Sequence, residues 1–569
     1  MIRNRTAWIL LASLATLLGL LMVWPLVEVI GGGCREQGAF TLKYLQGVFL
    51  NPVYAEGLIN SLGIAAGTTL LAALIAIPLA WLAYRYRFPG KGLFGALVLV
   101  PLILPPFVGA IGILQMLGPY GALNALLGLG PVDWLGRSRY LGVILIQALA
   151  LYPILYLNIS AALANVDPAM EEAAANLGCR GLAIFRRVTL PLIMPGLFAG
   201  GTLVFIASFT ELGTPLMLNY TRCAAVQIYD EIKEISASPF PYALVTVVLG
   251  FSVLLYLGMR VLLGGRAYAM QGKATVASQT RDTRGWRGLL VLLPFLLVTL
   301  LALTPHLGVL LTSISTPGGW YRTVLPTAFT GQHFVDAVGH DMTLNAIRNS
   351  LIFSSLAVVL NVILGLGVAW VVVRSTLRLR HLLDALAMVP LAVPGLVMAF
   401  GYLSAGNWLG NREWVRASPA LMNLLDVRVN PTLFLVVAYA VRRLPYMVRA
   451  AVAGLQQTSV TLEEAAANLG APPARVLRQV TIPLIAANLI AGVLLAFSFS
   501  MLEVSDSLIL AQKIEYYPIT KTIFELFQLI GVGRHLASAL GLWAMGFLTV
   551  TIVGSSMLLG KKLGALFRA

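Results

Sequence analysis

The chain has 569 residues, of which 59% are hydrophobic and only 11% are charged, with a formal net charge of +16. An average soluble domain is roughly 25% charged, so this composition excludes an ordinary soluble protein and makes a lipid bilayer the expected solvent. The positive residues fall in alternate loops between apolar segments, which predicts topology control in a membrane and no nucleic-acid partner.

Membrane helices need about 20 mainly apolar residues each. Twelve such stretches follow one another along the chain and are separated by short polar connectors. Their approximate bounds are 8–30, 57–83, 92–117, 140–165, 193–218, 241–263, 288–312, 346–373, 382–405, 431–452, 484–510 and 539–560. We expect the first to be a retained helix, because its apolar run exceeds the roughly 7–15 residues of a signal-peptide core.

The charged loops predict the orientation of the chain. About 25 of the 39 Lys and Arg residues lie at the termini or after even-numbered spans, and Arg442 and Arg443 are counted with the tenth. That side is predicted to be cytoplasmic, with both termini inside. Cys34 and Cys223 fall in predicted outer loops, where unpaired residues are favoured over a disulfide.

The sequence contains an internal repeat. The octet at 171–178 recurs without change at 463–470, and each copy is followed ten residues later by Val-Thr-aliphatic-Pro, at 188–191 and 480–483. Upstream, Asn-Ser-Leu at 60–62 matches 349–351, and Val-Pro-Leu at 100–102 matches 389–391. The offset is 289 residues upstream and 292 at the octet, so one half is a copy of the other.

A unit of six spans returns the chain to its starting side, so a second unit enters with the same orientation and the repeats are parallel. We therefore predict an all-α polytopic membrane protein with about 12 transmembrane helices in two six-helix repeats. The first repeat is residues 1–270, a cytoplasmic linker follows at 271–287, and the second repeat is residues 288–569. Both octets then face the cytoplasm.

The loops that carry the octets, at about 166–192 and 458–484, have a helical composition. Pro168 suits a first helical turn, Glu171 and Glu172 suit a helix N-terminal region, and the alanines that follow are good helix formers. Gly178 and Gly470 stand where a helix stops and the backbone turns. Each loop is predicted to form a short helix, a bend and a second short helix against the inner membrane face.

The spacing within these loops resembles the EAA signature loop of type I permeases of bacterial ATP-binding-cassette (ABC) importers. The matching residues are Glu171, Glu172, Ala173, Ala174, Gly178 and Pro191 in the first copy, and Glu463, Glu464, Ala465, Ala466, Gly470 and Pro483 in the second. In that family the loop is a coupling helix that docks in a groove of the ATPase. The resemblance covers nearly the whole chain; two ordinary connectors copied with their domain are the alternative.

The resemblance implies that other proteins complete the machine. We expect two copies of an ABC ATPase on the cytoplasmic side, which bind ATP and Mg²⁺, and a periplasmic or lipid-anchored solute-binding protein outside. No Walker A loop, catalytic cluster or metal-ligand spacing occurs in the chain, so it is expected to bind no cofactor itself and to be no enzyme. The expected location is the bacterial inner membrane.

Two glutamates occupy equivalent positions in the fifth span of each half, Glu211 and Glu503, and Asp506 shares a helix face with the second. An intramembrane carboxylate is costly unless it faces water or a partner, so we expect these residues to line the outer translocation path and favour a cationic solute. The alternative is that each glutamate reaches lipid headgroups or an arginine. Pro101, Pro105, Pro390 and Pro394 interrupt the third spans, where ordinary kinks are favoured over broken helices.

Two predicted outer segments, 227–234 and 520–527, have the pattern of surface helices; in the family such segments meet the binding protein, and a helix without a partner is the alternative. In its size and its two fused halves, the chain resembles permeases for ferric iron, thiamine and aminoethylphosphonate. Ferric iron is favoured as cargo by the overall resemblance and the paired carboxylates, ahead of thiamine, aminoethylphosphonate and polyamines. An ion-coupled secondary transporter, a membrane scaffold and an intramembrane enzyme are the rival classes.

Overall fold

The computed structural model describes residues 4–36, 38–103, 105–136, 139–235, 238–264, 281–283 and 285–558. These residues are mostly helical, and their strands are two short pairs: β1 (Arg35–Glu36) runs antiparallel to β2 (Ala39–Phe40), and β3 (Tyr86–Arg87) runs parallel to β4 (Arg281–Asp282). Most of the predicted linker, 271–287, lies outside the described residues. So do the basic residues after 558.

The first half contains the following helices. They are α1 (Asn4–Leu18), η1 (Gly19–Val23), α2 (Trp24–Gly33), α3 (Lys43–Leu50), α4 (Pro52–Arg85), α5 (Lys91–Leu97), η2 (Val100–Leu102), α6 (Pro106–Leu117), α7 (Ala122–Leu127), α8 (Tyr140–Ala164), α9 (Pro168–Asn176), α10 (Leu182–Ile184), η3 (Phe185–Thr189), α11 (Leu190–Phe209), α12 (Gly213–Met217), α13 (Ala224–Asp230), η4 (Glu231–Glu234) and α14 (Phe240–Gly264).

The second half repeats this order with small changes. Its helices are α15 (Trp286–Ile314), α16 (Gln332–Gly339), α17 (Asp341–Arg374), α18 (Arg380–Met388), η5 (Val389–Leu391), α19 (Gly395–Gly410), α20 (Glu413–Arg416), α21 (Pro419–Leu425), α22 (Thr432–Gln457), α23 (Val460–Asn468), α24 (Pro473–Val476), η6 (Leu477–Thr481), α25 (Ile482–Met501), α26 (Ser505–Leu510), η7 (Ile514–Tyr516), α27 (Ile519–Gln528) and α28 (Gly533–Leu558).

The predicted spans correspond to long helices. Among the described residues, nine helices are long and apolar enough to cross a membrane, and a bent pair makes a tenth. The other two predicted spans fall on α22 and α28. α22 carries three arginines, Arg442, Arg443 and Arg449, so Arg442 and Arg443 lie inside a helix. Our placement of those two residues in a cytoplasmic loop was wrong.

The bent pair corrects a second expectation. The segment 380–391 and α19 meet at 100°, and Pro394 stands at the break as the residue before α19. Pro105 precedes α6 in the same way. Proline lacks a backbone N–H and clashes with the preceding turn, so two prolines four residues apart break this span where we had favoured an ordinary kink.

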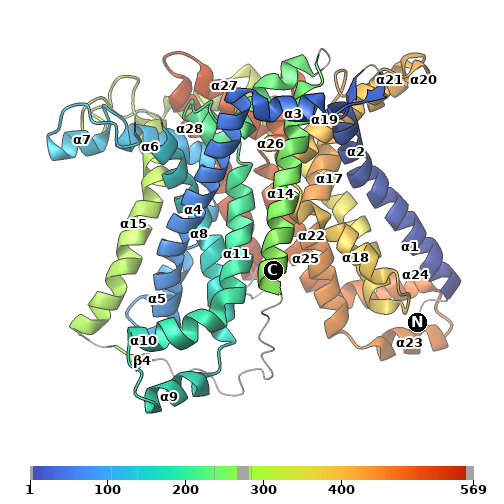
Figure 1. Cartoon of the computed structure of the whole chain (residues 1–569), viewed down its shortest axis with the longest axis horizontal. Coiled ribbons are helices and arrows are strands. Elements are labelled where there is room, and N and C mark those ends of the chain that lie inside the picture. The colour runs from blue at the N-terminus through green and yellow to red at the C-terminus, as the bar shows by residue number, and fades with distance from the viewer. Residues whose placement is uncertain are drawn as a thin grey trace.

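The two halves run in parallel. α4 and α17 each have 34 residues, α9 and α23 each have 9, and α11 and α25 each have 20. Figure 1 shows α9 and α23 at the same end of the molecule, at the bottom of the view, whereas α3, α20, α21 and α27 lie at the other end. The structure thus confirms the repeat architecture.

The first span of each half packs against the other half. α2 contacts α19 of the second half, where Trp24 meets Trp408 edge to face, and the Tyr402 hydroxyl of α19 donates to the Leu21 carbonyl of η1 at 2.8 Å. Reciprocally, α15 of the second half contacts α6 and α4 of the first, with Phe88 and Phe295 at 4.8 Å between ring centroids. These reciprocal contacts join the two halves.

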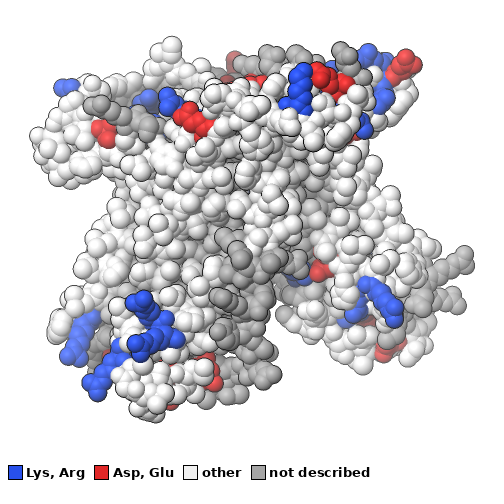
Figure 2. Space-filling model, in the orientation of Figure 1, with Lys and Arg blue, Asp and Glu red and all other residues white. Residues whose placement is uncertain are grey.

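Charged side chains gather at the two ends of the molecule, and the wide band between them is nearly free of surface charge in the view of Figure 2. Many large hydrophobic residues of the long helices are exposed, including Ile59, Leu74 and Ile363. Exposed apolar surface on this scale, bounded by charge above and below, matches the hydrocarbon core of a bilayer.

Candidate functional site

Both octets form short helices at the end of the molecule shown at the bottom of Figure 1. α9 begins where the Asp167 carboxylate accepts a hydrogen bond from the backbone N–H two residues on, and α23 begins where Ser459 does the same. Each helix ends just before a glycine with positive φ, Gly178 at +88° and Gly470 at +82°. A short second helix follows, as the composition predicts.

Glu171 holds α9 against the spans. Its carboxylate lies 2.9 Å from Arg85 Nη1 at the end of α4 and accepts a hydrogen bond from Thr189 Oγ1 at 2.6 Å. Thr189 ends η3, just before the fifth span. A single glutamate therefore joins α9 to two separate membrane helices.

Glu463 makes the same set of contacts in the second half. It lies 3.0 Å from Arg374 Nε at the end of α17, and Thr481 Oγ1 donates to it at 3.1 Å. Arg374 and Arg85 differ by the upstream offset of 289, and Thr481 and Thr189 by the octet offset of 292. Our sequence analysis quoted the threonines only as part of the repeat and overlooked the arginine–glutamate pairs; matching arginines at equal offsets was the available signal.

The outward face of α9 and α23 is exposed and partly apolar. Glu172 and Glu464, the second glutamate of each octet, are exposed and make no ion pair among the described residues. Leu177 is 87% exposed and Leu469 is 89% exposed. Among the other predicted positions, Ala173 and Ala465 are exposed, Ala174 is buried and Ala466 is half-buried, and Pro191 and Pro483 are the second residues of α11 and α25.

At the opposite end, the repeated Asn-Ser pair anchors a second set of helices. Ser61 Oγ accepts the backbone N–H of Ala224 at 2.9 Å at the start of α13, and Ser350 Oγ accepts that of Ile519 at 2.8 Å at the start of α27. The preceding asparagines donate to nearby carbonyls of the same segments. α13 and α27 are thus equivalent, at an offset of 295 residues.

Glu211 lies just beyond α11, in the predicted position near the end of the fifth span. Its carboxylate accepts the backbone N–H of Thr214 at 2.9 Å and the Gln147 side-chain amide at 3.3 Å. Both donors are uncharged, so Glu211 has no ionic partner among the described residues.

Glu503 and Asp506 lie in a buried charge cluster. Glu503 is 3% exposed and its carboxylate lies 2.8 Å from Arg442 and 2.5 Å from Arg443, both on α22. Asp506 is 1% exposed and lies 4.0 Å from Arg442. For Glu503 this arrangement matches the alternative interpretation, an arginine partner. The role of Glu211, Glu503 and Asp506 in a translocation path stays a prediction.

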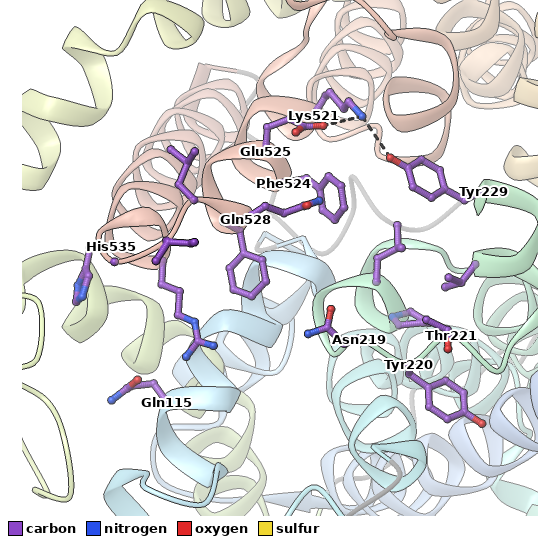
Figure 3. Close-up of a pocket in the computed structure, with 18 of the residues that line it drawn as sticks. Gln115, Asn219, Tyr220, Thr221, Tyr229, Lys521, Phe524, Glu525, Gln528 and His535 are labelled. Carbon is purple, nitrogen blue, oxygen red and sulfur yellow. Dashed lines mark hydrogen bonds and ion pairs between the residues drawn. The ribbon is translucent and has the colours of Figure 1, made fainter. Parts of the chain in front are cut away.

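A cavity of about 1050 Å³ opens between the halves at the α27 end. Its walls come from α12 and α13 of the first half, from α27 and the start of α28, and from the loop after α15. Figure 3 shows Tyr229 and Lys521 meeting across this space, with Gln115, Asn219 and His535 around it. Glu211, Glu503 and Asp506 are not among the described residues that line it.

Two parallel six-span repeats, paired surface helices at one end and an inter-half cavity at the other define a polytopic permease. The chain belongs to the family described as "Binding-protein-dependent transport system inner membrane component", whose model matches residues 72–267 and again 361–565. One match falls in each structural repeat, beginning within α4 in the first and within α17 in the second.

Individual relatives are similar over different lengths. A ferric transport system permease protein FbpB of Actinobacillus pleuropneumoniae is 27% identical over 81% of this chain, which spans 64% of that relative's length. An Fe(3+)-transport system permease protein of Haemophilus influenzae is 26% identical, and the alignment covers 88% of this chain and 89% of that relative. A probable molybdenum ABC transporter permease of Haloferax volcanii is 37% identical over 35% of this chain and 72% of its own.

Proposed function

We propose that this chain is the transmembrane permease subunit of an ABC importer, which moves a solute from a binding protein into the cytoplasm by alternating access. ATP and Mg²⁺ are bound and ATP is hydrolysed by separate ATPase subunits. The chain supplies the path and the surfaces through which nucleotide binding is converted into a conformational change.

The observation that carries this proposal is the pair of α9 and α23 surfaces at one end of the molecule. Each presents an exposed leucine and an exposed glutamate. A largely buried ion pair of Glu171 or Glu463 connects each surface to the spans. Two equivalent surfaces fit two copies of one ATPase. When the ATPases close, the two helices move together and the attached spans follow; only differential binding of the ATPases to the two states drives that switch.

The α9–α23 end is assigned to the cytoplasm, with both termini on that side, and the α27 end to the exterior. The binding protein then docks at the α27 end, over the cavity between the halves. The helices α13 and α27 include most of the two segments whose sequence suggested contact with that protein. The multi-pass chain is placed in the bacterial inner membrane.

Ferric iron is our proposed cargo. It is supported by the names of two relatives that align with more than four fifths of this chain. Thiamine, aminoethylphosphonate and polyamines are the alternatives within the same machine, and molybdate joins them because of the shorter relative.

Reconstitution tests the proposal directly. The chain is co-expressed with a candidate ATPase, and the purified complex is reconstituted in liposomes. The ATPase faces the lumen, and the binding protein is added outside the vesicles. We expect uptake of radiolabelled ferric iron that requires ATP inside the vesicles. Uptake driven by an ion gradient in the absence of any ATPase would instead establish the secondary-transporter alternative.

A further inference from the structure

The cavity between the halves contains the pseudo-twofold axis of the protein. Because Ala224 and Ile519 are anchored in the same way, Tyr229 and Phe524 are equivalent residues, each five positions further on. Their rings meet edge to face, with centroids 6.3 Å apart. A residue that contacts its own counterpart lies beside the axis that relates the two, so this aromatic pair marks the axis.

The residue next to that pair differs between the halves. Two positions after the anchored nitrogens, the first half has Val226 and the second half has Lys521. The Lys521 side chain is only 4% exposed, and its Nζ donates to the Tyr229 hydroxyl at 3.3 Å and lies 2.9 Å from Glu525 Oε1. One ammonium group therefore stands at the axis without a counterpart from the other half (Figure 3).

The surroundings keep this ammonium charged. Burial lowers the pKa of Lys521, but Tyr229 and Glu525 outweigh that effect and leave the pKa above its ordinary value. Nζ also lies 5.5 to 5.8 Å from the ring centroids of Tyr229, Tyr517 and Phe524, within the range of cation–π attraction. A second cation, Arg534, lines the same cavity, and Glu525 is the more exposed partner of the lysine pair.

We propose that Lys521 is a specificity-determining residue of the translocation path, which admits the solute as an anion or an anionic chelate. The proposal rests on the permease function argued above and names the chemical form of its cargo. A solute that moves along the axis must pass the ammonium group, where a bare metal cation meets like charge and a carboxylate or oxyanion replaces Glu525 as its partner. Ferric iron then travels with anionic ligands, and molybdate fits without change.

Anion binding by the purified full chain tests this inference without transport. Trp320 lines the cavity, so tryptophan fluorescence is titrated with citrate, molybdate and spermidine at constant ionic strength. We expect a saturable response to the two anions and none to spermidine. Lys521→Met should weaken anion binding at least tenfold, Lys521→Arg should stay within about threefold of the native chain, and Trp320→Phe should remove the signal.

The controls separate charge from folding. Lys43→Met removes an exposed lysine of α3 that does not line the cavity and should leave the titration unchanged. If Lys521→Met unfolds, Val226→Lys adds a second ammonium at the equivalent position and should tighten anion binding. Unchanged affinity in Lys521→Met, a response to spermidine alone, or no saturable anion response in the native chain would overturn the inference. A native chain that binds anions yet transports no ferric iron refutes the proposed cargo and leaves the role of Lys521 intact.

Discussion

Gly112 in α6 lies directly against Pro305 in α15, across the boundary between the halves. A Cβ atom on Gly112 would overlap the carbonyl oxygen of Pro305. Gly401 in α19, at the repeat offset of 289 from Gly112, faces Pro25 of the first span in the corresponding place, at 3.1 Å from a Cβ added there. Two equivalent glycines thus receive the first span of the opposite half, which makes the two halves one interlocked body.

This contact predicts unequal sensitivity to substitution. Gly112→Ala should hinder the approach of α15 and destabilise the protein by about 1–3 kcal/mol, because the added Cβ would lie 2.2 Å from the backbone carbonyl oxygen of Pro305. Gly401→Ala needs a shift of only a few tenths of an ångström and should be much milder. Gly250→Ala, at a position with nothing within 4 Å, is the control. Thermal unfolding of the purified chain measures all three, and equal midpoints would contradict the interlock.

The ion pairs behind the surface helices yield a second prediction. Glu463→Ala removes hydrogen bonds to Arg374 and Thr481, each worth about 1.5–3 kcal/mol when a charge is involved, and frees α23 from α17 and α25. We expect ATPase binding to survive while ATP-dependent uptake falls at least tenfold, because force is no longer passed to the spans. Glu413→Ala, which removes an exposed glutamate of α20 at the opposite end of the molecule, is the control.

The reversed pair separates coupling from local charge. Arg374→Glu combined with Glu463→Arg restores an ion pair between the same helices and should recover part of the lost uptake. Uptake that stays at the native level in Glu463→Ala would show that coupling through α23 does not depend on the ion pair between Arg374 and Glu463.

The architecture could be predicted from the sequence because its signals are local and duplicated. The octets, with Gly178 and Gly470 at their ends, carry their own helix and turn preferences. Because the duplicated unit has six spans, both copies must have the same orientation in the membrane. The cluster of Arg442, Arg443 and Glu503 could not be found in this way, since its members lie about 60 residues apart and the first half has Ala150 and Leu151 at the matching positions. Arg442 and Arg443, which we counted as loop charges, instead pair with Glu503 inside the fold.

The contact between Tyr229 and Lys521 was hidden for a different reason. Within the fifth-to-sixth-span region the offset changes from 292 to 295, because the loop before α27 is longer than the loop before α13. Equivalence there depends on the anchoring hydrogen bonds of Ser61 and Ser350, which only the folded chain displays.

The exposed leucines predict where an ATPase is held. Leu469→Asp places a charge on an apolar contact and should weaken ATPase copurification about tenfold, and Leu177→Asp should act in the same way on the other copy. Leu126→Asp is the control, because that leucine is exposed on α7, at the opposite end of the molecule. Full ATPase binding by the double variant Leu177→Asp, Leu469→Asp would exclude these surfaces as the docking site.

The two intramembrane glutamates are predicted to differ in what they hold together. Glu503→Gln leaves Arg443 without its carboxylate partner and Arg442 with Asp506 alone, 4.0 Å away, and the loss of a buried partner costs about 3–5 kcal/mol. Glu211→Gln keeps an oxygen that accepts the Thr214 N–H and meets no arginine, so it should fold normally. Unfolding midpoints separate the two variants, and uptake by folded Glu211→Gln then tests the path itself: a changed rate or solute preference places Glu211 on it, whereas native transport removes Glu211 from it.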